Sequence, residues 1–149
     1  MAKVHDFSAL DTVSACDKGI EIELHHPVTH AGLGIFWTLL GRDSQVFRDQ
    51  IRQNIDEATR RSAYARKRGK EDVPDTADIQ EQRGISLLVA CSVAWRYGEK
   101  NMFPFQKKGN ALEELAFTPE NVRRVLTELP EVRRQIDEAI GDLENFMKV

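Results

Sequence analysis

The fold is decided by an alternating stretch, Ile20-Glu21-Ile22-Glu23-Leu24-His25, in which every second residue is aliphatic. Successive side chains of a β-strand point to opposite faces, so the stretch predicts a strand with one apolar and one charged face. Pro27 ends this strand because it has no N–H to donate to a neighbouring strand. A short connection containing Pro and Gly leads to the apolar residues 34–40, and the pair predicts an antiparallel β-hairpin over residues 20–40.

The second strand of this hairpin is apolar on both faces, since Ile35, Trp37 and Leu39 alternate with Phe36 and Leu40. A strand of this kind is covered on both sides, either by its own chain or on one side by a partner. The sequence alone leaves both possibilities open.

A long helix is expected directly after the hairpin, over residues 44–69. Asp43-Ser44 supplies an N-cap, and Gly69 lies at the expected end. Apolar and small residues recur at helical spacing and predict one buried face. This stripe consists of Phe47, Ile51, Ile55, Ala58, Ser62 and Ala65.

A central helix over residues 76–96 is expected next, with Asp75 or Thr76 as its cap. The stretch from Ile85 to Trp95 is apolar nearly all round, which is typical of a helix at the centre of a domain. Gly84 lies inside this helix, where it indicates a close approach or a bend.

The last third of the chain is expected to contain a loop, 97–117, and two amphipathic helices, 119–129 and 131–147. Pro119 suits the first position of its helix, because the N–H that proline lacks is unbonded there in any helix. The loop holds apolar residues close to a turn, so it is expected to form either a small hairpin or an ordered loop.

These elements predict an α+β, mainly α, fold, in which an N-terminal antiparallel β-hairpin is followed by about four helices packed as one domain, 19–149. The length of 149 residues suits one domain, and 41% hydrophobic residues suffice for a core. Residues 1–18, which mix polar and scattered apolar side chains, are expected to form a flexible N-terminal arm.

Charge argues against a dedicated nucleic-acid-binding protein, because the net charge is −3 and such domains are usually basic. The segment 42–70 is the exception, with nine Lys or Arg and four Asp or Glu, a local net charge of +5. Its basic end begins at Arg60 and reaches Lys70. Acidic residues follow at once, and we favour a solvated face or an acidic protein partner for this end of the helix.

Cys16 and Cys91 have the spacing of neither a disulfide framework nor a zinc site, so two reduced thiols are expected. The N-terminal residues lack the apolar core of a secretory signal, and no apolar run approaches the ~20 residues that span a bilayer. These observations predict a soluble protein of the cytoplasm.

No catalytic constellation is visible in the sequence, and we expect no enzyme activity. His25, His26 and His30 form the one candidate metal cluster, but neighbours on a strand point to opposite faces, so His25 and His26 diverge. The serines lack a nucleophile motif, and Cys91 lies in an apolar stretch where a thiol normally serves packing. No Gly-rich phosphate-binding motif is present. We therefore expect neither a metal nor a cofactor.

Two blocks of sequence bracket most of the chain, residues 20–147. The first runs from His26-Pro27-Val28-Thr29 through Leu33-Gly34 and an apolar strand to Gly41-Arg42-Asp43-Ser44. The second comprises Phe117-Thr118-Pro119-Glu120-Asn121 and a closing segment, Gln135-Ile136-Asp137-Glu138-Ala139-Ile140-Gly141-Asp142-Leu143-Glu144-Asn145-Phe146. In joint order and spacing, these blocks resemble the tail assembly chaperones of long-tailed bacteriophages.

The resemblance implies a non-catalytic protein of the host cytoplasm that binds the tape measure protein while the tail tube polymerises around it. The tape measure protein is a very long, helix-rich chain, so its chaperone needs apolar grooves that bind helices reversibly. The resemblance also implies that this chain tends to self-associate as a homo-oligomer. The candidate partner-binding residues are Phe36, Trp37, Phe103, Phe105 and Phe146, each of which is equally compatible with the internal core.

Two other functions remain open at this point. One is a structural virion component, such as a tail or head–tail connector subunit, which stays in the finished particle. The other is a small nucleic-acid-binding regulator that uses the basic stretch from Arg60 to Lys70.

Overall fold

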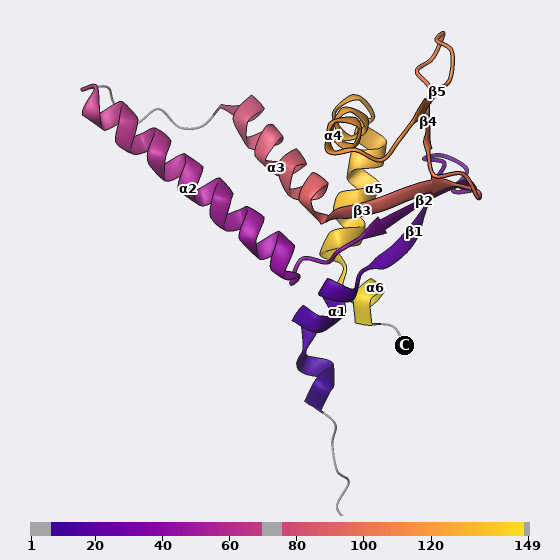
Figure 1. The fold of residues 1–149 in the computed structure, drawn as a ribbon, viewed down its shortest axis with the longest axis horizontal. Coiled ribbons are helices and arrows are strands. Elements are labelled where there is room, and N and C mark those ends of the chain that lie inside the picture. The colour runs from indigo at the N-terminus through magenta and orange to yellow at the C-terminus, as the bar shows by residue number, and fades with distance from the viewer. Residues whose placement is uncertain (1–6, 70–75, 148–149) are drawn as a thin grey trace, which may run out of the picture.

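The computed structural model describes residues 7–69 and 76–147 and has an α+β fold, with about 56% helix and 20% strand (Figure 1). The predicted fold class is therefore confirmed. The described part contains six α-helices and five strands. Five of these helices follow the hairpin, one more than expected, because the last predicted helix is divided.

An antiparallel three-stranded sheet has the strand order β1-β2-β3. β1 (Ile20–His25) and β2 (Gly32–Leu39) are the two strands of the predicted hairpin, and β3 (Ser92–Tyr97) pairs with the other edge of β2. Trp37, near the middle of β2, lies opposite Ile22 on β1 and Trp95 on β3. Alternate residues of the three strands therefore form one apolar face.

The central helix is shorter than predicted. α3 (Ala77–Cys91) begins on the predicted cap, where the Thr76 hydroxyl accepts a hydrogen bond from the Ile79 N–H at 3.3 Å, but it ends at Cys91. The remaining residues of the expected helix belong to β3. The apolar pattern continues through Trp95, and here the free edge of β2 supplies partners for the backbone N–H and C=O groups, which favours a strand.

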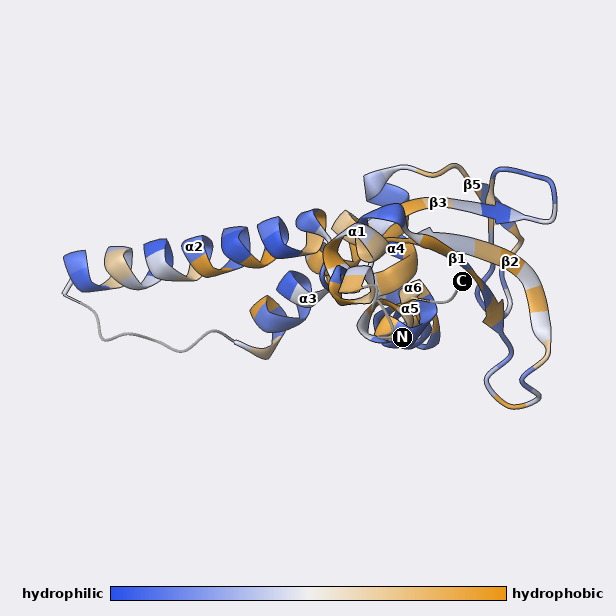
Figure 2. Cartoon of the chain, turned by 90° about the horizontal axis from the view of Figure 1, so that it is seen from below, coloured by the Kyte–Doolittle hydropathy of each residue, from blue (hydrophilic) through white to orange (hydrophobic). Residues whose placement is uncertain are grey.

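α2 (Gln45–Lys67) is the predicted long helix, and it begins on the predicted cap, since the Ser44 hydroxyl accepts from the Phe47 N–H at 3.2 Å. It projects from the rest of the molecule, with α3 alongside part of its length (Figures 1 and 2). None of its described residues is buried. The predicted buried face is therefore wrong for Ile51 and Ile55, because the described sheet and C-terminal helices lie beyond one end of α2, whereas Phe47 at that end packs half-buried against the core.

Between residues 7–69 and 76–147, no helix is both long and apolar enough to cross a membrane. Even α2, which has 23 residues, is coloured mostly as hydrophilic residues in Figure 2.

Most of the described residues of the expected arm, 1–18, are helical. A 3-10 helix, η1 (Phe7–Leu10), precedes α1 (Thr12–Lys18). The Asp11 carboxylate caps α1 by accepting from the Ser14 N–H at 3.0 Å. α1 packs against the C-terminal end of the chain, and Cys16 is fully buried there, so this one apolar side chain anchors the segment. Residues 1–6 lie outside the described residues.

The expected loop, 97–117, contains two short paired strands, β4 (Phe103–Phe105) and β5 (Glu113–Leu115), which form the small hairpin that the sequence allowed. α4 (Pro119–Glu128) follows at the position of the predicted helix 119–129. Its Thr118 cap accepts from the Asn121 N–H at 3.2 Å.

The last predicted helix, 131–147, is divided into α5 (Pro130–Gly141) and α6 (Leu143–Met147). The break lies at Asp142, whose φ of −93° and ψ of 97° are extended rather than helical. The Asp142 carboxylate accepts from the Glu144 N–H at 3.1 Å, so it caps the new helix. This turn directs α6 towards α1.

Candidate partner-binding site

Trp37 and Phe103 lie in the hydrophobic core, where they contact Trp95. The ring centroids are 5.1 Å apart between Trp37 and Trp95 and 5.2 Å apart between Trp95 and Phe103. Both indole N–H groups are bonded, that of Trp37 to the Ser92 hydroxyl at 3.0 Å and that of Trp95 to the Leu115 carbonyl at 3.1 Å. Trp37 and Phe103 are 0% and 2% exposed. For these two residues the expected partner surface is corrected to core, because their own chain covers them.

Phe105 is also a core residue, at the end of β4. Its ring lies under the Arg124 guanidinium, with 4.5 Å between the guanidinium carbon and the ring centroid. Glu113 on the paired strand β5 accepts two hydrogen bonds from Arg124, at 3.0 and 3.1 Å. The small hairpin and α4 therefore cover Phe105, and it is not available to a partner in this structure.

Phe146 lies on α6 and is buried at the junction of α6, α1 and the link between β2 and α2. A Cβ added at Gly41, in that link, would lie 2.9 Å from the Cys16 Cβ and 3.1 Å from the Phe146 ring. The junction is so close that a side chain at position 41 would displace these neighbours. Phe146 therefore holds the N- and C-terminal helices together rather than facing a partner.

Phe36 is the one half-buried member of the five candidates, on the outer face of the sheet. The Arg96 guanidinium lies over its ring, 4.0 Å from the centroid. Glu21 accepts two hydrogen bonds from Arg96, at 3.0 and 2.7 Å, and fixes it there. The second apolar face of β2 is therefore covered in part by a charged side chain of its own sheet.

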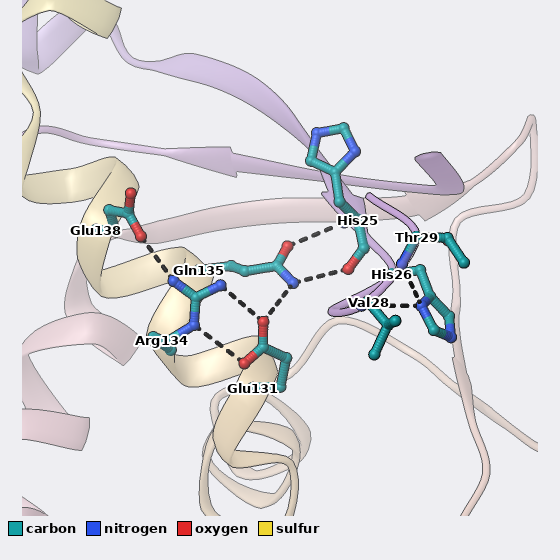
Figure 3. Close-up of polar contacts among 8 residues, drawn as sticks. All are labelled: His25, His26, Val28, Thr29, Glu131, Arg134, Gln135 and Glu138. Carbon is teal, nitrogen blue, oxygen red and sulfur yellow. Dashed lines mark hydrogen bonds and ion pairs between the residues drawn. The ribbon is translucent and has the colours of Figure 1, made fainter. Parts of the chain in front are cut away.

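A cleft of about 410 Å³ lies between the turn of the β1–β2 hairpin and α5, and we call it the turn–helix cleft (Figure 3). The Gln135 side-chain amide closes one end of it, accepting from the His25 N–H at 2.9 Å and donating to the His25 carbonyl at 2.8 Å. The Gln135 amide thus makes the two hydrogen bonds that the backbone of a neighbouring strand would make to His25 at the end of β1. The residues that line it include His26, Pro27, His30, Gln135, Glu138 and Asp142.

Ion pairs occupy the charged groups on the helix side of this cleft. Arg134 donates to Glu131 at 3.0 and 2.7 Å and to Glu138 at 2.8 Å, and Gln135 also donates to Glu131 at 3.2 Å (Figure 3). The hydrogen bonds from Arg134 and then from Gln135 lower the pKa of Glu131 to about 2. The Glu131 carboxylate is therefore held ionised by its own helix.

The three histidines of the turn do not converge on one point. His26 Nδ1 accepts from the Val28 and Thr29 N–H groups at 3.1 and 3.2 Å, so it caps the turn (Figure 3). His30 occupies the left-handed region, with φ of 60°. Within residues 7–69 and 76–147, no group of three His, Cys, Asp or Glu side chains is placed to hold a metal ion.

The two thiols are free and buried. Burial raises the pKa of the Cys91 thiol to about 12, and burial also raises that of Cys16. Each is therefore protonated at neutral pH and serves as a small apolar side chain, as expected for Cys91.

Sequence reasoning missed Arg96 and Gln135, which complete the outer sheet face and the turn–helix cleft. Gln135 contacts a residue 110 positions earlier, and no local pattern signals such a contact. Arg96 belongs to a segment expected to be helical, in which its position opposite Phe36 was hidden.

No known protein family, no curated protein and no solved structure matches this chain.

Proposed function

We propose that this chain is a non-catalytic binding protein of the host cytoplasm, and that it acts as a tail assembly chaperone for the tape measure protein of a long-tailed bacteriophage. The proposal starts from the two sequence blocks that resemble such chaperones. Such a protein acts by non-covalent binding alone. It therefore needs a stably folded domain and an accessible surface that binds helices.

The observation that carries the proposal is that the two blocks lie against each other. The Arg42 N–H, in the first block, donates to the Ile140 carbonyl, in the second, at 3.2 Å. His26, Pro27 and His30 line the turn–helix cleft together with Gln135 and other residues of the second block. Segments about a hundred positions apart in the sequence are thus adjacent in the structure. An architecture shared with these chaperones would require the two blocks to be adjacent, whereas two chance resemblances would not.

The accessible surface is supplied by α2. Its described residues are all at least partly exposed, and Ile55 is 59% exposed. Ile51, one turn earlier, is 37% exposed, and an apolar patch that stays exposed to solvent is a candidate interaction surface. This favours a protein whose task is to bind another chain.

Affinity purification from infected cells tests the proposal. The tagged chain is expected to recover the tape measure protein, identified by mass spectrometry, whereas an unrelated tagged phage protein of similar size and charge recovers none. Purified virions are expected to lack the chain.

Two results would overturn the proposal. Recovery of every other tail protein without the tape measure protein removes the chaperone function. A fixed number of copies of this chain in purified virions assigns it instead to the structural components of the tail or head–tail connector.

A further inference from the structure

The uncovered stripe of α2 has the spacing of a coiled-coil seam. Ile51, Ile55, Ala58, Ser62 and Ala65 follow one another at intervals of four, three, four and three residues. This 3.5-residue repeat is the one by which two helices stay in contact along their length. The small side chains towards its C-terminal end permit a close approach of a second helix.

The seam does not face α3. The groove between the two helices is lined on the α2 side by Gln50, Asn54 and Glu57, and the Asn54 amide donates to a backbone carbonyl of α3 at 3.4 Å. At 100° per residue, Ile51 and Ile55 lie roughly a quarter turn around the helix from that groove. Their side chains are 37% and 59% exposed. The described helix α3 therefore leaves the seam open.

A hollow of about 400 Å³ lies on this face of α2, and its lining has the pattern of a coiled-coil hole. Ile55, Ala58, Thr59 and Ser62 stand at positions i, i+3, i+4 and i+7. Four residues in this arrangement receive one side chain of the facing helix. Ala63 and Arg66 extend the hollow by one further turn.

The positions on either side of the seam decide which helix fits. Flanking residues of a coiled coil face those of the partner, and here they are Arg52, Asn54, Thr59, Arg61, Arg66 and Arg68, of which Asn54 already contacts α3. Four of the six are arginines and none is acidic. Two copies of α2, parallel or antiparallel, would bring arginine against arginine, which opposes self-association through this seam.

We propose that the α2 seam is the docking surface for an amphipathic helix of a different protein, one with aliphatic seam residues flanked by Asp or Glu. The acidic flanks complement the positive charge that the four arginines give this face, and an aliphatic side chain fills the hollow over Ile55 and Ala58. If the proposed function holds, this helix is a segment of the tape measure protein. The identity of the protein that supplies the helix thus rests on the proposed function.

The direct test is binding of a fluorescent synthetic helix, with Leu at its seam positions and Glu at its flanks, to the full chain. The Ile55→Asp variant is expected to bind it with roughly tenfold or more lower affinity, because the aspartate places a charge in the apolar seam. Val46→Asp is the matched control, since Val46 is 38% exposed on another face of the same helix and the charge change is identical. The control is expected to bind as the original chain does.

Three outcomes overturn the inference: equal loss of binding in the two variants, equal binding of a peptide with Lys flanks, or a dimer of the free chain that Ile55→Asp dissociates. Binding of a DNA or RNA duplex with steep salt dependence, unchanged by Ile55→Asp and without peptide binding, would assign the arginines to nucleic acid. Circular dichroism that matches between the two variants shows that both are folded.

This test and the affinity purification fail independently. If the tape measure protein is recovered equally by the original chain and by Ile55→Asp, the function stands and the α2 docking surface is wrong. If the acidic peptide binds with the expected selectivity but no tape measure protein is recovered, the surface stands and the proposed function is wrong.

Discussion

Trp37 on β2 and Ile55 on α2 both belong to apolar patterns of the sequence, but they differ in how far the rest of the described chain covers them. Trp37 is fully buried between Trp95 and Phe103, whereas Ile55 is 59% exposed on a projecting helix. The comparison of the sheet end with α2 teaches that periodicity identifies the apolar side of an element and not what covers it. At the sheet end the cover is β4, α4 and α5, and over the α2 seam we propose another protein.

The largest effect is expected from removing the buried ring. Trp37→Ala should lower the free energy of unfolding by ~3–5 kcal/mol, because it leaves a cavity beside Trp95 and removes the indole bond to Ser92. Ile55→Ala should change it by no more than ~0.5 kcal/mol, because that side chain is exposed. Urea denaturation followed by circular dichroism measures both. A loss at Ile55 equal to that at Trp37 would mean that α2 is covered within the chain.

A smaller effect is expected where backbone and side chains meet at Gly41. Gly41→Ala should cost ~1–3 kcal/mol, because its Cβ would press on Cys16 and Phe146. Gly84→Ala is the control. Among the described residues no atom outside the helix lies within 4 Å of a Cβ added there, so the close approach considered for Gly84 is wrong. Gly84→Ala should leave the free energy of unfolding unchanged or raise it by ~0.5–1 kcal/mol. Urea denaturation measures both variants, and an equal decrease in the free energy of unfolding of the two would contradict the account.

The half-buried Phe36 should give an intermediate case between the core and α2. Arg96→Met keeps a long side chain over the ring but removes the cation and its pair with Glu21. We expect a small but measurable loss of stability, because the contact with the ring and the ion pair are both removed. Arg52→Met on α2, whose ion pair with Asp49 is exposed, should cost less in the same assay. An equal cost would show that Arg96 contributes no cover to Phe36.

The smallest effect concerns pH at the turn–helix cleft. The folded-state pKa of Glu131, about 2, lies below its ordinary value of 4.5, so its pairing stabilises the fold above that value and is lost as the pH falls towards 2. Arg134→Met should raise the Glu131 pKa towards 4.5, as measured by NMR titration of its side-chain carboxyl carbon. Arg123→Met, which removes a pairing with Gln82 and Ser86 elsewhere, should leave it unchanged. An unchanged Glu131 pKa in Arg134→Met would contradict the assigned cause.

Local signals account for the parts of the fold that the sequence predicted. The alternation from Ile20 to Leu24 placed β1, and the caps Ser44 and Thr118 fixed where two helices begin. These features depend on neighbours within a few residues, so a single sequence contains them. The division at Asp142 was missed because the apolar stripe continues across it.

Contacts between distant segments account for what could not be predicted. Ser92 to Tyr97 form a strand because the edge of β2 is free, and the local pattern gave no sign of that edge. Likewise, the five candidate aromatics were identified as apolar, but only the tertiary structure places four of them in the core. The α2 stripe was recognised from its period, and its exposure follows from the absence of a covering layer among the described residues.

Site-specific photocross-linking in infected cells tests most directly whether α2, rather than the hairpin end, meets the partner. A benzophenone amino acid replaces Ile55 on α2 or, as the matched position, Val28 in the β1–β2 turn, which is 78% exposed and also apolar. The account predicts that the tape measure protein is cross-linked from position 55 and not from position 28. Cross-linking of that protein from position 28, with none from position 55, would contradict it.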